Sequence, residues 1–156
     1  MSSLHDVSVI THKEFAELFG IYHLAKEPLM LWGPAGIGKT EGIKEYCIRY
    51  AMAKGLKYSE NIDDQAEDTF VCQIINLHQF DAAELKGLPV PVYEEMVTKF
   101  FQTNCMPRKG NGIIVFDEIN LAPALIMASG YSLVNDRRLG DYLFFSSFQC
   151  FCLQAL

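Results

Sequence analysis

Residues 33–41 have the types and spacing needed to hold a chain of phosphates. They read GPAGIGKTE and contain the pattern GxxxxGK[ST]. Glycines let such a loop curl so that successive backbone N–H groups point at phosphate oxygens, and the helix that follows adds positive potential. Lys39 is placed to reach the β- and γ-phosphates, and the Thr40 hydroxyl is placed to bind Mg²⁺. The pattern predicts a site for a nucleoside triphosphate and Mg²⁺. Its expected binding residues are Gly33, Pro34, Ala35, Gly36, Ile37, Gly38, Lys39, Thr40 and Glu41.

Two acids at the end of the apolar run GIIVFDE, residues 112–118, form a second group with catalytic potential. A buried parallel strand delivers its last residues to the carboxyl edge of its sheet. There Asp117 would bind Mg²⁺, and Glu118 would polarise the water that attacks the γ-phosphate. We assign a catalytic role to Lys39 as well. Any strand that ends in an acidic turn produces this pattern, so the prediction depends on its pairing with the phosphate loop.

Competing interpretations of these two groups have less support. A glycine-rich turn without a ligand is disfavoured by the apolar run before residue 33 and the helical pattern after residue 40. The chain has neither the guanine-reading pattern NKxD nor the LSGGQ signature of transporter ATPases. Asn120 either orients Glu118 or the attacking water, or caps the next helix, and we favour the cap.

Strands and helices must position both groups. Residues 28–32 form an apolar run typical of a buried strand, and residues 41–52 continue the loop as a helix. An amphipathic helix with Thr11 as its N-cap is expected over 11–24. The other expected elements are a solvated acidic connection at 57–69, a strand at 70–77, a short helix at 82–85, helical spacing over 92–102, a turn at 107–112 and a helix at 122–135.

Composition narrows the partners and the compartment. The formal net charge of −6 and the 13 scattered Lys and Arg residues argue against a nucleic-acid surface. The five cysteines contain no CxxC pair and are expected to be reduced thiols of a cytoplasmic protein. No leader opens the chain, and no apolar run reaches the roughly 18 residues of a membrane helix. Neither the four histidines nor the acids of 57–69 favour a metal site.

Four segments, in this order along the chain, resemble the MoxR and dynein-related branch of the AAA+ ATPases. They are GPAGIGKTE, FDAAELKGLPVP, GIIVFDEINLAP and YSLVNDRRLGDY, and the resemblance covers residues 12–142. It implies a single AAA+ core domain over 1–156, built as an α/β three-layer sandwich with a parallel P-loop NTPase sheet. It also implies Walker A roles for Lys39 and Thr40, and Walker B roles for Asp117 and Glu118.

The same resemblance implies an activity and partners. Such proteins assemble into rings, usually hexamers, bind ATP between neighbouring subunits, and use its hydrolysis to remodel or activate a partner protein. Many work with a von Willebrand A-type cochaperone, so a chaperone-like function follows. The segment Asp81–Pro91 would face the pore or the neighbouring nucleotide, with an ordinary loop as an equal alternative. Arg137 and Arg138 could serve as an arginine finger, but two cations that favour a helix end are the preferred interpretation.

The last residues depart from the family. In the family a hairpin, a fourth strand with a polar sensor, an arginine finger, a fifth strand and a helical lid follow the DRRLGEY stretch. Residues 143–156 read LFFSSFQCFCLQAL and resemble none of these parts. We therefore expect a truncated or frame-shifted end and a sheet without its fourth strand. The tail either fills that slot or forms a frayed apolar terminus, which we favour. The alternative function is a hydrolysis-deficient nucleotide-binding fragment or regulatory subunit.

Overall fold

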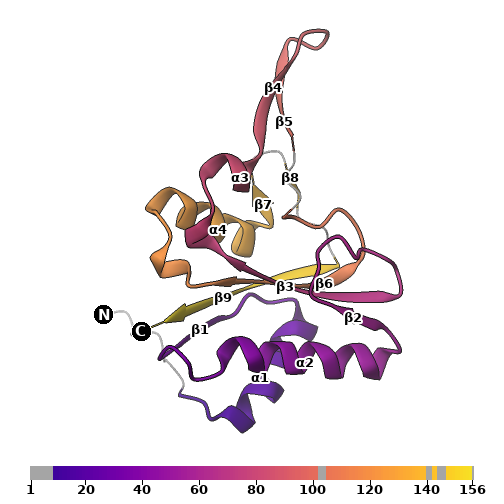
Figure 1. Ribbon diagram of the computed structural model, residues 1–156, viewed down its shortest axis with the longest axis vertical. Helices are drawn as coiled ribbons and strands as arrows, with labels where there is room; N and C mark the ends of the chain where they lie inside the picture. Colours follow the sequence, from indigo (N-terminus) through magenta and orange to yellow (C-terminus); the bar gives the residue numbers. More distant parts are fainter. Residues whose placement is uncertain (1–8, 102–104, 140–141, 144–146, 156) are drawn as a thin grey trace.

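The chain folds around a five-stranded parallel sheet with helices on both faces (Figure 1). The computed structural model describes residues 9–101, 105–139, 142–143 and 147–155. Helices α1 and α2 cover one face, and α3 and α4 lie on the other. The predicted three-layer α/β/α sandwich is therefore confirmed. In sheet order the strands are β1 (Met30–Gly33), β9 (Phe148–Ala155), β6 (Asn111–Asp117), β3 (Thr69–Asn76) and β2 (Lys57–Ser59), and the helices are α1 (His12–Ala25), α2 (Lys39–Lys54), α3 (Ala82–Lys86) and α4 (Ala124–Asp136).

Strand β6 lies at the centre of the sheet, and this position accounts for its apolar sequence. Ile113 and Val115 pack into the core beneath α1 and α2, whereas Ile114 and Phe116 pack into the core beneath α4. All four side chains are fully buried. A strand covered on both faces needs an unbroken apolar run rather than alternation, and this is the pattern that predicted it.

The C-terminal segment corrects the sequence-based expectation. Strand β9 lies between β1 and β6, with Cys152 paired to both Met30 and Phe116. Phe148 and Cys150 face the α4 side, while Phe151 faces the α1 and α2 side. The frayed apolar terminus and the missing fourth strand were therefore wrong predictions. The physical reason is that these residues carry no charge, and apolar side chains on both faces suit only a central parallel strand.

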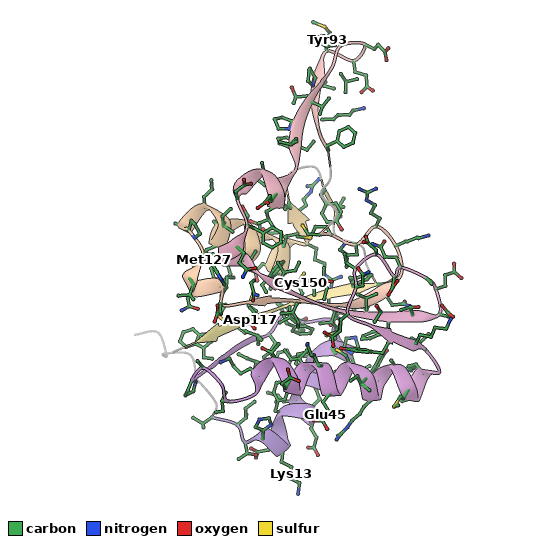
Figure 2. All side chains as sticks on the ribbon, viewed as in Figure 1. Lys13, Glu45, Tyr93, Asp117, Met127 and Cys150 are labelled. Atoms are coloured by element: carbon green, nitrogen blue, oxygen red, sulfur yellow. The ribbon has the colours of Figure 1, made fainter. Side chains whose placement is uncertain are left out.

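A second correction concerns residues 92–102, for which the spacing indicated a helix. Strands β4 (Leu88–Val92) and β5 (Val97–Phe101) instead form an antiparallel hairpin. The hairpin projects away from the sheet, with Tyr93 near its tip (Figure 2). Its β-branched and aromatic residues favour extended backbone over helix. Tyr93 and Met96 are 81% and 88% exposed, so the hairpin displays large apolar side chains to solvent.

The helix boundaries follow local signals in the sequence. Thr11 is the N-cap of α1, as predicted, and the structure adds a capping box with Glu14. Helix α4 ends at Asp136, and Arg137 follows it in a left-handed conformation with φ of 53°. Three short strands were missed. They are β2 at the start of the acidic connection and a two-stranded hairpin made of β7 (Arg138–Leu139) and β8 (Tyr142–Leu143). Among the helices described here, none is both long enough and apolar enough to cross a membrane.

Gly112 should be essential for the packing of the central strands. A Cβ at this position would lie 2.2 Å from the carbonyl oxygen of Val71 and 2.7 Å from the Phe148 ring. We expect Gly112→Ala to lower the free energy of unfolding by about 2 kcal/mol or more, because backbone cannot yield as a flexible side chain does. Gly20→Ala is the control, since its Cβ would meet only the Tyr46 ring at 3.3 Å. Urea unfolding of both variants checks this, and equal stabilities would contradict it.

His23 should make the stability pH-dependent. Its Nδ1 lies 2.8 Å from the Tyr46 hydroxyl, and burial lowers its pKa from 6.5 to about 4. Between these two values the unfolded chain binds a proton that the folded chain does not, so stability should be complete above pH 6.5 and fall as the pH drops toward 4. After allowance for partial exposure, we expect a loss of about 1–2 kcal/mol. Urea titrations at several pH values should show this loss in the wild type and a smaller one in His23→Phe; identical pH profiles would refute the assignment.

Candidate nucleotide-binding site

The phosphate loop lies where the sequence placed it, between the end of β1 and the start of α2. Gly36 and Gly38 have φ of 77° and 87°, in a backbone region that residues with a Cβ rarely adopt. Gly38 is the N-cap of α2 and provides no side-chain cap. The first N–H groups of α2 have no partner within the helix, so they and the helix dipole favour an anion at this position.

Lys39 bends back over the loop. Its Nζ donates to the carbonyl oxygen of Gly33 at 2.8 Å and to that of Pro34 at 3.0 Å. Both acceptors belong to the predicted set of binding residues. The ammonium is therefore held beside the glycines by neutral carbonyl groups, which a charged phosphate oxygen can replace with a stronger partner.

Asp117 joins the loop to the central strand. The Thr40 hydroxyl donates to Asp117 Oδ2 at 2.9 Å, between residues 77 positions apart in the chain. Asp117 Oδ1 accepts from the backbone N–H of Glu118, also at 2.9 Å. Figure 2 shows Asp117 at the end of the sheet that faces the start of α2. A hydroxyl and a carboxylate held together in this way offer the hard oxygen ligands that Mg²⁺ prefers.

A cavity of about 270 Å³ lies between the loop and the two acids. Most of the predicted site residues line it. Gly33 and Pro34 contribute through their contacts with Lys39, whereas Ile37 is 52% exposed and lines a different pocket, together with Trp32 and Phe15. The lining residues are Ala35, Gly36, Gly38, Lys39, Thr40, Glu41, Asp117 and Glu118.

Glu118 has an unusual conformation. Its φ of 50° and ψ of 41° place a residue other than glycine in the left-handed region. Such a conformation costs on the order of 1–2 kcal/mol and persists only where the surroundings impose it. Glu118 Oε2 lies 3.5 Å from Nδ1 of His78, which belongs to the short helix η1 (Leu77–Gln79) after β3. The carboxylate is thus turned toward a neighbouring strand end.

Sequence reasoning did not find His78, although a signal for it existed. Asn76 at the end of β3 pairs with Asp117 at the end of β6. Parallel strands end at the same sheet edge, so the residues just after residue 76 had to lie near the two acids. From the sequence, the histidines were considered only as possible metal ligands.

Two other residues considered from the sequence, Asn120 and Arg137, do not line this cavity. The preferred role of Asn120 as the cap of α4 is wrong, because Pro123 is that N-cap and Asn120 belongs to the short helix η2 (Ile119–Leu121). Arg137 donates to the carbonyl oxygen of Lys26 at 3.4 Å and, with Gln149 near the start of β9, lines a pocket away from the phosphate loop. In the described part of the chain, no group of three or more His, Cys, Asp or Glu residues could hold a metal.

The comparison with solved structures supports the fold. The structure is similar to that of a Cytophaga hutchinsonii protein provisionally assigned as an ATPase, with a TM-score of 0.52 and 15% identity over 94% of this chain and 39% of that chain. It also resembles NtrX from Brucella abortus, with a TM-score of 0.48 and 14% identity over 97% of this chain and 31% of that one. No protein-family model and no curated protein sequence matches the chain. The chain thus spans well under half of the first of these proteins, with which it shares the fold, a parallel sheet between two layers of helices.

Proposed function

We propose that this chain binds ATP with Mg²⁺ and acts as an AAA+ ATPase subunit of the MoxR-like kind. The observation that carries the proposal is the 2.9 Å contact between Thr40 and Asp117. It brings the hydroxyl of the phosphate loop and the carboxylate of the central strand to one cavity, with the ammonium of Lys39 beside them. A glycine-rich turn that binds no ligand does not require a carboxylate beside it.

Each residue has a separate task in binding. The N–H groups of residues 36–40 would surround the β-phosphate, and Lys39 would exchange the carbonyls of Gly33 and Pro34 for β- and γ-phosphate oxygens. Thr40 and Asp117 would hold Mg²⁺, directly and through its water shell. When bound, Mg²⁺ neutralises charge on the phosphate oxygens. The pair fits this ion because both groups are oxygen donors already oriented by a mutual hydrogen bond.

Hydrolysis would depend on Glu118. In the reaction a water oxygen bonds to the γ-phosphorus while the bond from that phosphorus to the β,γ-bridging oxygen breaks, giving ADP and phosphate. Glu118 would accept the proton that the water loses. Glu118 lines the cavity, and its carboxylate lies beside His78 in this structure. Asn120 is then left as a candidate to orient the water.

A second candidate function is nucleotide binding without efficient hydrolysis, as an assembly or regulatory subunit. In the single chain, no arginine is among the described residues that line the cavity. An arginine that reaches the γ-phosphate from a neighbour contributes about 10³- to 10⁵-fold in rate. The isolated chain should accordingly bind ATP much better than it hydrolyses it.

Assembly and partners belong to the same proposal. The chain would form a ring, most simply a hexamer, that remodels or activates a partner protein, with a von Willebrand A-type cochaperone as a further candidate partner. The segment Asp81–Pro91 runs from α3 into the projecting hairpin, whose exposed apolar side chains suit contact with another protein. A reducing, cytoplasmic location fits the buried thiols of Cys47, Cys72, Cys150 and Cys152.

Lys39→Ala should strongly weaken ATP binding. Removal of the only ammonium that lines the cavity among the described residues should weaken MgATP affinity by at least about tenfold, because backbone N–H groups alone do not neutralise the phosphates. Titration with a fluorescent ATP analogue measures this. Lys54→Ala is the matched control, since it removes the same charge from the opposite end of α2. Equal affinities of Lys39→Ala and the wild type would refute the site.

The adjacent acids should separate binding from hydrolysis. Glu118→Gln keeps the size of the side chain but cannot accept the proton, so phosphate release should fall by about 10²- to 10⁴-fold with ATP affinity retained. Asp117→Ala should instead weaken Mg²⁺-dependent binding by about tenfold or more. Phosphate-release assays and titrations with and without Mg²⁺ test both variants. Wild-type turnover by Glu118→Gln would show that another group is the base, and absent turnover in the wild type would favour the second candidate function.

A further inference from the structure

The first residue of α1 makes a contact with the phosphate loop that the proposed function does not use. His12 Nε2 lies 2.9 Å from the carbonyl oxygen of Ile37, which is 25 residues away in the chain. A carbonyl oxygen only accepts hydrogen bonds, so Nε2 carries the proton and donates. The position of the ring is set by the start of the helix, where the capping box of Thr11 and Glu14 fixes the backbone.

Gly38 lies between this imidazole ring and the cavity. A Cβ at Gly38 would come within 3.1 Å of His12 Nε2 and within 3.5 Å of Cε1, while Gly38 also lines the cavity of about 270 Å³. His12 itself does not line that cavity. The ring therefore contacts the outer side of the loop, and any effect on a ligand in the cavity must pass through the backbone.

The geometry of one peptide unit supplies such an effect. The described chain has no cis peptide bond, so the carbonyl of Ile37 and the N–H of Gly38 point in opposite directions within one plane. A donor that holds the carbonyl on the outer side of the loop also holds this N–H toward the inner side. Rotation of the plane would turn the carbonyl dipole toward the cavity, where it would repel a phosphate oxygen.

We propose that His12 is a positioning residue of the nucleotide site, which fixes the peptide between Ile37 and Gly38 so that the Gly38 N–H faces the phosphates. The proposal rests on the proposed function, because it requires a phosphate ligand in the cavity. Helix α1, which lies outside the phosphate-loop motif, would then pre-organise the loop. Less of the binding free energy would be spent on ordering the loop.

Variants of His12 test the role of the donor. The amide nitrogen of His12→Gln reaches about as far as imidazole Nε2, whereas His12→Asn is too short and His12→Leu has no donor. Lys13→Ala is the control on the same helix, because Lys13 is exposed and points away from the sheet (Figure 2). Circular dichroism melts of all four variants check that each one folds. If His12→Leu does not fold, the comparison of His12→Asn with His12→Gln still tests the role of the donor.

Affinities for MgATP and for Mg²⁺ with inorganic tripolyphosphate give the first readout. We expect His12→Leu and His12→Asn to weaken both ligands equally, by about three- to tenfold, and His12→Gln and Lys13→Ala to stay near the wild type. A loss confined to ATP would overturn the proposal, because it would place His12 against the nucleoside. Wild-type affinities in the Leu and Asn variants, or an equal loss in the Gln variant, would also overturn it.

The nucleotide-free protein gives a second readout that does not depend on binding. The ¹H–¹⁵N resonance of the Gly38 amide should shift in His12→Asn and return toward its wild-type position in His12→Gln. An unchanged resonance in the Asn variant would overturn the positioning role. If the wild-type chain bound neither ATP nor tripolyphosphate, the proposed function would fail, and with it the functional part of this inference, whereas the amide resonance would still report whether His12 orders the loop.

Discussion

The pairing of β6 on both of its edges is the constraint on which the rest of the structure depends. β3 and β9 flank it in parallel, and its side chains are buried on both faces. A strand held in this way cannot shift along its axis without breaking two ladders and moving its apolar side chains to the wrong face. Its last residue, Asp117, is therefore fixed in space. The Thr40 hydroxyl at the start of α2 meets a carboxylate whose position is set by the whole sheet.

Local sequence predicted the parts of the fold whose signals are local. Thr11 indicated the start of α1, and the glycines at 36 and 38 indicated the loop. The run at 112–118 specified the strand that carries the two acids. Most of the expected binding residues then gathered around one cavity, because consecutive residues of a loop stay together whatever the rest of the chain does. Their roles in binding remain a proposal.

The features that were missed depend on contacts between distant segments. The prediction for β9 was wrong because residues 148–153 match no family motif, although they are apolar. No local signal indicates that a strand is needed beside Gly112 of β6. The hairpin was misjudged because short apolar runs fit both helix and strand spacing. His12 and His78 belong to none of the sequence motifs. His12 reaches the loop from a separate helix, a contact that only the folded structure shows, whereas the position of His78 beside Glu118 follows from the shared edge of parallel strands.

The prolines of the projecting hairpin decide which of its edges can pair further. Pro89 lies opposite Phe100, and Pro91 lies opposite Thr98. Proline has no N–H, so these pairs cannot exchange two hydrogen bonds, and the backbone nitrogens of both prolines must face outward. The outer side of β4 therefore has no donor at these positions and cannot extend the sheet. Thr98 and Phe100 direct their own N–H and C=O groups outward along β5. A two-stranded ribbon that would otherwise present unpaired backbone groups on both edges can therefore add a strand only along β5.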